Sequence, residues 1–200
     1  MGKEQLLILT GFSASGKDTL MEKLLEANLG YDRVVTHTSR PIRPGEVHGR
    51  DYHFVSRQEF EDKLTRGEFL EYVDYAGDYK GTHKEAVLEV LKGKALIWRI
   101  DMSRAAIVHN TFKEVFDEET ASAIIAKTKV VLLTVSDPEH LKKRMLKRDR
   151  ERFSKRNFLE RMAKDLEVFK KYSFQHIIYN EEERLEEAFK ELLGIIEGKS

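Results

Sequence analysis

Short apolar runs alternate with longer helical patterns along most of this chain. The apolar runs have the length of β-strands, and they lie at Leu6–Leu9, Arg33–Thr36, Ala95–Ile100, Lys129–Val135 and His176–Tyr179. Stretches with helical spacing separate most of these runs. Strands that alternate with helices are typical of a mainly parallel sheet whose faces are covered by helices. The pattern therefore predicts an α/β sandwich around a mainly parallel five-stranded sheet.

The ends of several helices can also be located from the sequence. Ser56 and Glu59 have the spacing of a capping box, and Asp137-Pro138 follows Ser136 at the head of another helical pattern. The last helical pattern carries its apolar residues on one face: Leu185, Ala188, Phe189, Leu192, Leu193 and Ile196. We interpret this face as core packing and not as a surface for a partner.

Two stretches depart from the alternating pattern. Residues 37–83 contain a loop rich in proline, glycine and arginine, then a short helix, and then an alternating run from Phe69 to Val73. They predict a small inserted lobe. Residues from about 142 to 160 are rich in arginine and lysine, and they predict a mobile lid. The rest of the single predicted domain, residues 1–36 and 84–200, would form the core.

Composition narrows the classes of function. The chain has 200 residues, of which 40% are apolar, enough for one continuous core. Thirty-five basic residues balance 35 acidic ones, so no global attraction to nucleic acid or to an anionic membrane is expected. No cysteine is present, which excludes disulfides and thiolate metal sites. The apolar run Leu6–Leu9 is too short for a signal peptide or a membrane span, so we expect a cytoplasmic protein, either a monomer or a homodimer.

A phosphate-binding loop follows the first apolar run. Gly11 and Gly16-Lys17 give the spacing G-x-x-x-x-G-K, and a helical pattern comes directly after it. In such a loop the backbone N–H groups and the N-terminus of the helix face a triphosphate, and the lysine follows charge onto the leaving oxygen. The residues expected to contact the triphosphate are Gly11, Ser13, Ala14, Ser15, Gly16, Lys17, Asp18 and Thr19. The alternative is a glycine-rich turn without function.

Asp18 is unusual in this loop. The position after the lysine normally carries a serine or threonine that holds Mg²⁺. We therefore expect either the hydroxyl of Thr19 or the carboxylate of Asp18 to take this role. Mg²⁺ that binds together with ATP is the predicted cofactor.

The segment from Thr36 to Phe54 suggests a clamp for the phosphate of an acceptor. Arg40 and Arg43 lie three residues apart in a loop stiffened by proline, so their guanidinium groups can fork one phosphate dianion. The hydroxyl of Tyr52 can donate a hydrogen bond to the same phosphate. The alternative is an exposed charged loop without a ligand.

A second group of residues can bind a base. Glu71 offers two acceptor oxygens, which suit the N1–H and 2-amino donors of guanine, whereas adenine has no such pair of donors. The hydroxyl groups of Thr36 and Thr82 can add contacts. The alternative is that Glu71 is an ordinary solvated carboxylate.

In the segment from Thr36 to Phe54, the chain resembles guanylate kinase. It keeps almost every fixed position from Thr36 to Phe54, and the similarity continues through Phe69 to Tyr72, Gly77 to Thr82 and the arginine-rich stretch. The resemblance implies a P-loop kinase that transfers the γ-phosphoryl group of ATP to GMP, giving ADP and GDP. The resemblance also implies the positions of further site residues. Arg144, Arg148 and Arg161 would lie over the triphosphate, Asn180 beside the adenine, and Asp101 near the metal. A solvated basic helix face and a turn asparagine are the alternatives.

Three positions depart from the family pattern. Lys80 stands where relatives have a second tyrosine on the acceptor phosphate, and it can preserve anion binding with a point charge. Arg99 replaces the first carboxylate of a D-x-D pair, which leaves only Asp101, and Arg104 replaces a small residue. Because Asp18 adds a carboxylate to the loop, our hypothesis is that Asp18 and Arg99 are a compensating exchange.

Other functions stay open. Kinases of deoxynucleotides or of a ribose bisphosphate also carry Lys-Asp-Ser/Thr loops, although they do not keep the segment from Arg40 to Tyr52. A guanylate-kinase-like module that binds phosphopeptides would generally have lost the phosphate loop. A GTPase would need an Asn/Lys-x-x-Asp guanine reader, which is absent. Residues 109–127 have no role that the sequence assigns.

Overall fold

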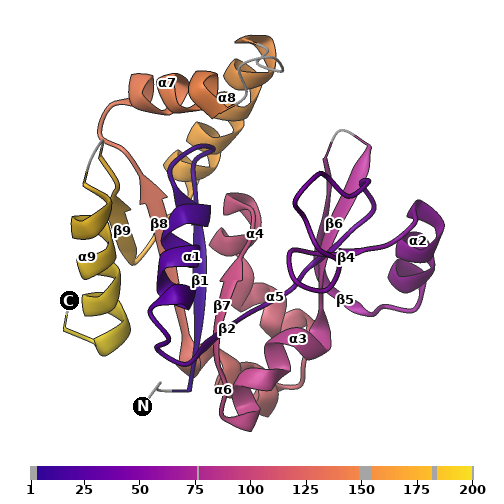
Figure 1. Cartoon of the computed structure of the whole chain (residues 1–200). Coiled ribbons are helices and arrows are strands. Elements are labelled where there is room, and N and C mark those ends of the chain that lie inside the picture. The colour runs from indigo at the N-terminus through magenta and orange to yellow at the C-terminus, as the bar shows by residue number, and fades with distance from the viewer. Residues whose placement is uncertain (1–3, 76, 149–154, 182–183, 200) are drawn as a thin grey trace.

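The chain folds around two separate sheets (Figure 1). The structure is a computed structural model, and it describes residues 4–75, 77–148, 155–181 and 184–199. The larger sheet has the strand order β2-β7-β1-β8-β9, and each neighbouring pair is parallel. Its strands are β1 (Gln5–Gly11), β2 (Tyr31–Arg33), β7 (Ala95–Arg99), β8 (Thr128–Thr134) and β9 (His176–Tyr179). The predicted five-stranded sheet is therefore confirmed.

The central strand β1 supplies side chains to both faces of this sheet. Leu6 and Ile8 belong to the core on one face, and Leu7 and Leu9 belong to the core on the other. Because successive side chains of a strand point to opposite faces, an unbroken apolar run is what a strand covered on both sides requires. Helices cover both faces, which gives the three layers of the sandwich (Figure 1).

The two helical layers come from different parts of the chain. On one face lie α1 (Lys17–Glu26) and α9 (Leu185–Glu197). The other face is covered by α3 (Lys84–Leu88), the 3₁₀ helix η1 (Glu89–Lys92), α4 (Met102–Ala106), α5 (Val108–Val115) and α6 (Glu118–Lys127). Phe112 of α5 and Ile124 of α6 are fully buried. The stretch 109–127, which has no assigned role in the sequence, therefore packs against the sheet.

One predicted strand was placed too late in the chain. The run Arg33–Thr36 was expected to form it, but β2 spans Tyr31–Arg33. The buried Tyr31 fixes the strand because its hydroxyl donates to Gln5 Oε1 at 2.7 Å. Val34 N still donates to Ile97 O at 2.9 Å, and the chain then leaves for the second sheet.

The second sheet lies beside the core and has the order β4-β3-β6-β5 (Figure 1). Its strands are β3 (His37–Thr38), β4 (His53–Phe54), β5 (Phe69–Tyr75) and β6 (Asp78–His83). The helix α2 (Arg57–Thr65) begins with the predicted capping box of Ser56 and Glu59. Phe60 of α2 stacks on Phe69 and Tyr79 of the sheet. All these elements fall within residues 37–83, and the limits of a separate lobe remain a prediction.

The stretch predicted to form a lid includes parts of two helices, α7 (Pro138–Arg148) and α8 (Lys155–Lys171). Figure 1 shows them at one end of the molecule, beyond β8. Residues 149–154 lie outside the described residues, and the mobility of the lid stays a prediction. In the ranges that the structure describes, no helix combines the length and the apolarity needed to span a membrane.

Candidate active site

The phosphate loop joins β1 to α1, and its two glycines are required by close contacts. Gly11 has a φ of 133°, and a Cβ atom there would lie 1.9 Å from Leu133 O. Gly16 has a φ of 95°, and a Cβ atom there would lie 2.3 Å from Asn180 Nδ2. Any other residue at either position would force the neighbouring strand or side chain to move.

Asn180 supports this loop from the end of β9. Its side chain is only 5% exposed, and its Nδ2 donates to Ser15 O at 2.7 Å. Arg144 of α7 donates through Nη2 to Asn180 O at 2.8 Å. The residue predicted to lie beside the adenine thus holds the backbone of the phosphate loop, and one of the predicted lid arginines reaches the same place.

The phosphate loop uses polar groups of the protein to satisfy its own donors. Lys17 Nζ donates to Gly11 O at 2.8 Å and to Phe12 O at 2.7 Å. Burial lowers the pKa of Lys17 to about 8. The backbone N–H of Ser13 donates to Asp165 Oδ2 at 3.2 Å, so a carboxylate of α8 occupies a donor that phosphate oxygens use in such loops. Nothing in the helical pattern around Asp165 indicated this contact.

Arg99 contacts both the phosphate loop, through Asp18, and Tyr52, which lies just before β4 of the second sheet. Its Nη1 forms an ion pair with Asp18, and its Nη2 donates to the hydroxyl of Tyr52 at 2.6 Å. The two residues of the hypothetical exchange are therefore direct partners. The same guanidinium group also contacts a predicted ligand of the acceptor phosphate.

Cationic groups surround the buried ring of Tyr52. The guanidinium carbon of Arg40 lies 5.1 Å from the ring centroid and Lys80 Nζ lies 5.5 Å from it. Burial alone would raise the pKa of Tyr52, but the charges of Arg99, Lys80 and Arg40 outweigh it and hold that pKa below its ordinary value. Such a cluster of positive charge is suited to an anion.

Glu46 holds the two predicted clamp arginines in place. Arg40, which is 8% exposed, donates from Nη1 to Glu46 Oε2 at 2.7 Å and from Nη2 to Glu46 Oε1 at 2.5 Å. The backbone N–H of Arg43 donates to the same carboxylate at 2.8 Å. The side chain of Arg43 is exposed. One carboxylate thus organises the loop and pairs with Arg40.

Two of the three residues predicted to bind a base, Glu71 and Thr82, are joined by a hydrogen bond, and Trp98 extends the chain. Trp98 Nε1 donates to Thr82 Oγ1 at 3.0 Å, and Thr82 Oγ1 donates to Glu71 Oε1 at 2.6 Å. Thr82 is fully buried, so in this structure its hydroxyl orients the carboxylate of Glu71. Burial raises the pKa of Glu71 to about 7. Thr36 lies just before β3, where its carbonyl accepts the N–H of His53 at 2.9 Å.

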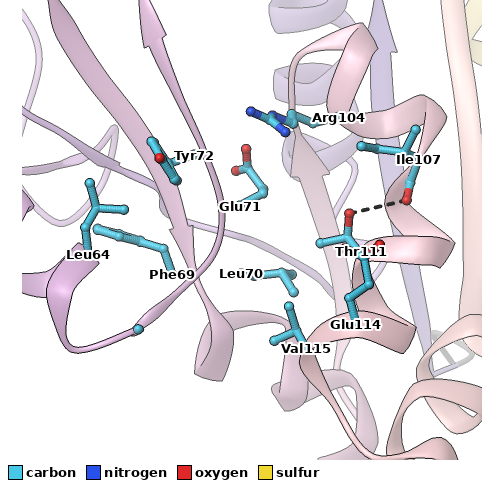
Figure 2. A pocket seen from close by; sticks show the side chains of 11 residues that line it. Leu64, Phe69, Leu70, Glu71, Tyr72, Arg104, Ile107, Thr111, Glu114 and Val115 are labelled. Carbon is cyan, nitrogen blue, oxygen red and sulfur yellow. Dashed lines mark hydrogen bonds between the residues drawn. The ribbon is translucent and has the colours of Figure 1, made fainter.

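Glu71 also lines a pocket of about 300 Å³ between β5 and helices α4 and α5 (Figure 2). The wall from the second sheet includes Leu70 and Tyr72, and the wall from the core includes Ile107 and Arg104. Most of the lining is apolar, with a few polar groups at the edges. An apolar lining with a few polar groups is typical of small-molecule sites.

The family of this chain follows from comparison with known proteins. The family model described as guanylate kinase matches residues 3–199. This chain belongs to the guanylate kinase family. A relative in Fusobacterium nucleatum, a guanylate kinase, is 36% identical over 195 residues, which cover 96% of this chain and 95% of that protein.

Two further relatives of the family match over a smaller part of their own length. The guanylate kinase of a Nostoc species is 46% identical over 111 residues, 55% of this chain and 56% of that protein. Guanylate kinase 2, chloroplastic/mitochondrial, of Oryza sativa subsp. japonica is 36% identical over 196 residues, 97% of this chain and 64% of that protein. The chain thus spans between about half and two thirds of these two relatives.

Solved structures support the same family. The crystal structure of guanylate kinase from Anaplasma phagocytophilum has a TM-score of 0.70 and 25% identity, and the match covers 99% of this chain and 87% of that chain. A shikimate kinase structure from Bacteroides thetaiotaomicron has a TM-score of 0.50 and 15% identity, and the match covers 96% of this chain and 98% of that chain. At this identity it shows the fold alone.

In this guanylate kinase family member, the three predicted metal residues suit a cation that arrives with phosphates. Asp18 and Thr19 are exposed at the start of α1. Asp101 caps α4, since its Oδ1 accepts Ser103 N at 2.8 Å and Ser103 Oγ at 2.6 Å. Among the described residues, no group of three or more histidine or acidic side chains is arranged around a metal site. Mg²⁺ is commonly held by one or two carboxylates together with substrate phosphates, which these oxygen atoms fit.

Two predicted lid arginines belong to the helices α7 and α8. Arg148 is the last residue of α7, and Arg161 lies in α8. The side chains of both lie outside the described residues. Their role over the triphosphate stays a prediction.

Proposed function

We propose that this chain transfers the γ-phosphoryl group of ATP to GMP, reversibly, with ADP and GDP as products. The observation that supports it most is the arrangement around Arg99. This side chain contacts the phosphate loop through Asp18 and the cationic acceptor cluster through Tyr52. A donor phosphate and an acceptor phosphate bound at these two places would meet at Arg99.

The proposed reaction needs no nucleophile from the protein. An oxygen of the GMP phosphate attacks the γ-phosphorus in line, and the protein positions both groups and stabilises their charge. Arg40, Arg43 and Lys80 would hold the acceptor phosphate, and Lys17 would leave its two carbonyl partners for the triphosphate. Mg²⁺ bound with ATP, held by Asp18, Thr19 and Asp101, would neutralise part of the triphosphate charge.

The test is the rate of ADP formation with Mg·ATP and five acceptors: GMP, dGMP, AMP, UMP and ribose 1,5-bisphosphate. We expect the highest kcat/KM with GMP, and chromatography should show GDP as the product. A higher value with another acceptor would leave a P-loop kinase but refute the assignment of GMP. Binding of GMP without turnover would instead favour a phosphopeptide-type binding module.

The ionisation of Glu71 predicts a pH dependence. Because burial raises its pKa to about 7, the carboxyl group of the free protein is mainly protonated below that pH, and it then accepts poorly from two guanine donors. The proton must leave before GMP binds. We expect kcat/KM for GMP to fall as the pH decreases through about 7, approaching about tenfold per pH unit.

The Glu71→Gln variant is the control for this pH profile. The phosphate of GMP has its own pKa of about 6. The decrease in kcat/KM around that pH should therefore persist in both the wild type and Glu71→Gln. The limb near pH 7 should disappear in the variant, whose kcat/KM is lower throughout. If Glu71→Gln keeps the limb near pH 7, another group titrates there.

The pair of Asp18 and Arg99 predicts non-additive mutations. Arg99→Asp would place two carboxylates together, and Asp18→Ser would leave a largely buried guanidinium group with Tyr52 alone. We expect each single variant to lose about tenfold in kcat/KM, and the double variant to recover most of both losses. Such recovery needs a coupling of about 2.8 kcal/mol, which lies within the range of up to about 3 kcal/mol for residues in direct contact.

This coupling is measured from kcat/KM and from the Mg²⁺ concentration at half-maximal rate in all four proteins. As a matched control, the Lys23–Glu186 pair links α1 to α9 away from the phosphate loop. The same cycle there should be additive. Unchanged or improved activity and Mg²⁺ dependence in Asp18→Ser would refute the exchange hypothesis.

These substrates also bear on compartment and partners. ATP and GMP are the partners we propose, and the cytoplasm, where both nucleotides occur, is the location we propose. The absence of cysteine in the sequence is compatible with that compartment.

A further inference from the structure

Arg104 extends into the same pocket as Glu71 from the opposite wall. It belongs to α4 of the core, whereas Glu71 belongs to β5 of the second sheet. Figure 2 shows the guanidinium group of Arg104 directed toward the carboxylate of Glu71. At about 300 Å³, the pocket is at the lower end of the volumes of small-molecule sites, which suits a single base.

The guanidinium group of Arg104 has a hydrogen-bond donor to spare. Its Nε is buried, and it has no hydrogen-bond partner among the described residues. No ion pair within 4.0 Å joins it to Glu71 in the structure. The end of the guanidinium group is directed toward Glu71 in the pocket (Figure 2), so its N–H donors can reach an acceptor atom on a ligand bound there.

The edge of guanine supplies such an acceptor. Along this edge the acceptor O6 lies beside the donor N1–H, the 2-amino donor follows on the other side, and N7 is a second acceptor next to O6. Arginine is well matched to O6 and N7, because its planar fork presents two parallel donors. If Glu71 binds N1–H and the 2-amino group, a donor is needed on the side of O6. Adenine would present its own amino donor there.

We propose that Arg104 is a specificity residue of the acceptor site, which donates to O6, and through its fork to N7, of the guanine held by Glu71. This inference rests on the proposed function, because it names a further contact for the same acceptor. By the family resemblance of the sequence, Arg104 stands in place of a small residue, so the family pattern implies no such contact. The charge of Arg104 also lowers the pKa of Glu71 against the effect of burial, which helps to keep the carboxylate ionised.

Base analogues test the contact atom by atom. The wild-type protein and Arg104→Ala are compared with GMP, with 6-thio-GMP, in which O6 becomes a weak acceptor, with 7-deaza-GMP, and with IMP, which lacks the 2-amino group. We expect the wild type to prefer GMP over 6-thio-GMP by about tenfold in kcat/KM and in affinity. This ratio should fall to about two or less in Arg104→Ala. The ratio of GMP to IMP, which reports on Glu71, should stay within about twofold.

Two more variants separate specificity from folding. Arg104→Lys keeps the charge and can donate to O6, but it lacks the planar fork of arginine. We therefore expect it to keep the preference for O6 and to lose the discrimination against 7-deaza-GMP. Lys113→Ala removes one positive charge from an exposed position of α5 that does not line the pocket, and it should leave all ratios unchanged. Thermal unfolding midpoints confirm that each variant is folded.

The outcomes distinguish this inference from the proposed function. If GMP is phosphorylated but the ratio of GMP to 6-thio-GMP is the same in the wild type, Arg104→Ala and Arg104→Lys, Arg104 does not read the base. If the wild type does not phosphorylate GMP at all, the proposed function itself is refuted. A ratio that falls in Arg104→Ala and is kept in Arg104→Lys supports the assignment.

Discussion

Replacing Lys17 with methionine is expected to lower kcat/KM for ATP by about 10³-fold, mainly through kcat. Lys17 is the only residue of the loop motif whose charge can follow the γ-phosphoryl group as it leaves the β-phosphate. In the structure its ammonium group is held between two backbone carbonyls at 2.7 and 2.8 Å, which poises it inside the loop. Methionine keeps the length of the side chain and removes the charge. The measurement is the steady-state rate of ADP formation with ATP varied at saturating GMP.

Lys23→Met provides the matched control for this variant. Lys23 lies on the same helix and loses the same charge, but its partner is Glu186 on the far side of α1 from the loop. We expect a change of less than about twofold in kcat/KM, because surface ion pairs contribute little. Equal losses in Lys17→Met and Lys23→Met would show that the effect comes from folding or net charge.

The second large effect is expected from Arg40→Ala, which should lower kcat/KM for GMP by about 100-fold. Arg40 is buried, and its guanidinium group already has the bidentate geometry that a phosphate needs, since it makes two hydrogen bonds to Glu46. Arg40→Lys should recover only part of this loss, because a point charge cannot make both bonds. The measurement is the rate with GMP varied at saturating ATP.

Arg50→Ala is the control for the same loop. The side chain of Arg50 is 63% exposed, and its ion pair is with Asp51. Its removal changes the net charge equally, and kcat/KM for GMP should change by less than about twofold. If Arg40→Ala lowers kcat/KM for GMP no more than Arg50→Ala does, Arg40 does not bind the acceptor phosphate.

The sequence predicted the fold well wherever one face or both faces of an element were marked by apolar spacing. The strand β9 lies where it was expected, and the capping box of Ser56 begins α2 as predicted. The error at β2 has a physical cause. That strand is anchored by the hydroxyl of Tyr31 on Gln5, a polar contact between distant residues that an apolar pattern does not record.

The site was predictable where it is local and not predictable where it is assembled from distant parts. The phosphate loop is contiguous, so its glycines and lysine identify it. The contact of Asp165 with Ser13 joins residues 152 positions apart, and the bond of Arg99 to Tyr52 joins residues 47 positions apart. Such contacts depend on how the helices and the second sheet pack on the core, which the spacing of residue types does not determine.

The support of the phosphate loop by distant residues also bears on the order of folding. The loop is encoded near the N-terminus, but Phe12 N is bonded to Leu133 O, and Ser15 O accepts from Asn180, 165 positions later. A chain emerging from the ribosome therefore carries the loop sequence long before the residues that shape it have been made. Because long-range strand pairing is slow, nucleotide binding should appear late, after Asn180 has been made.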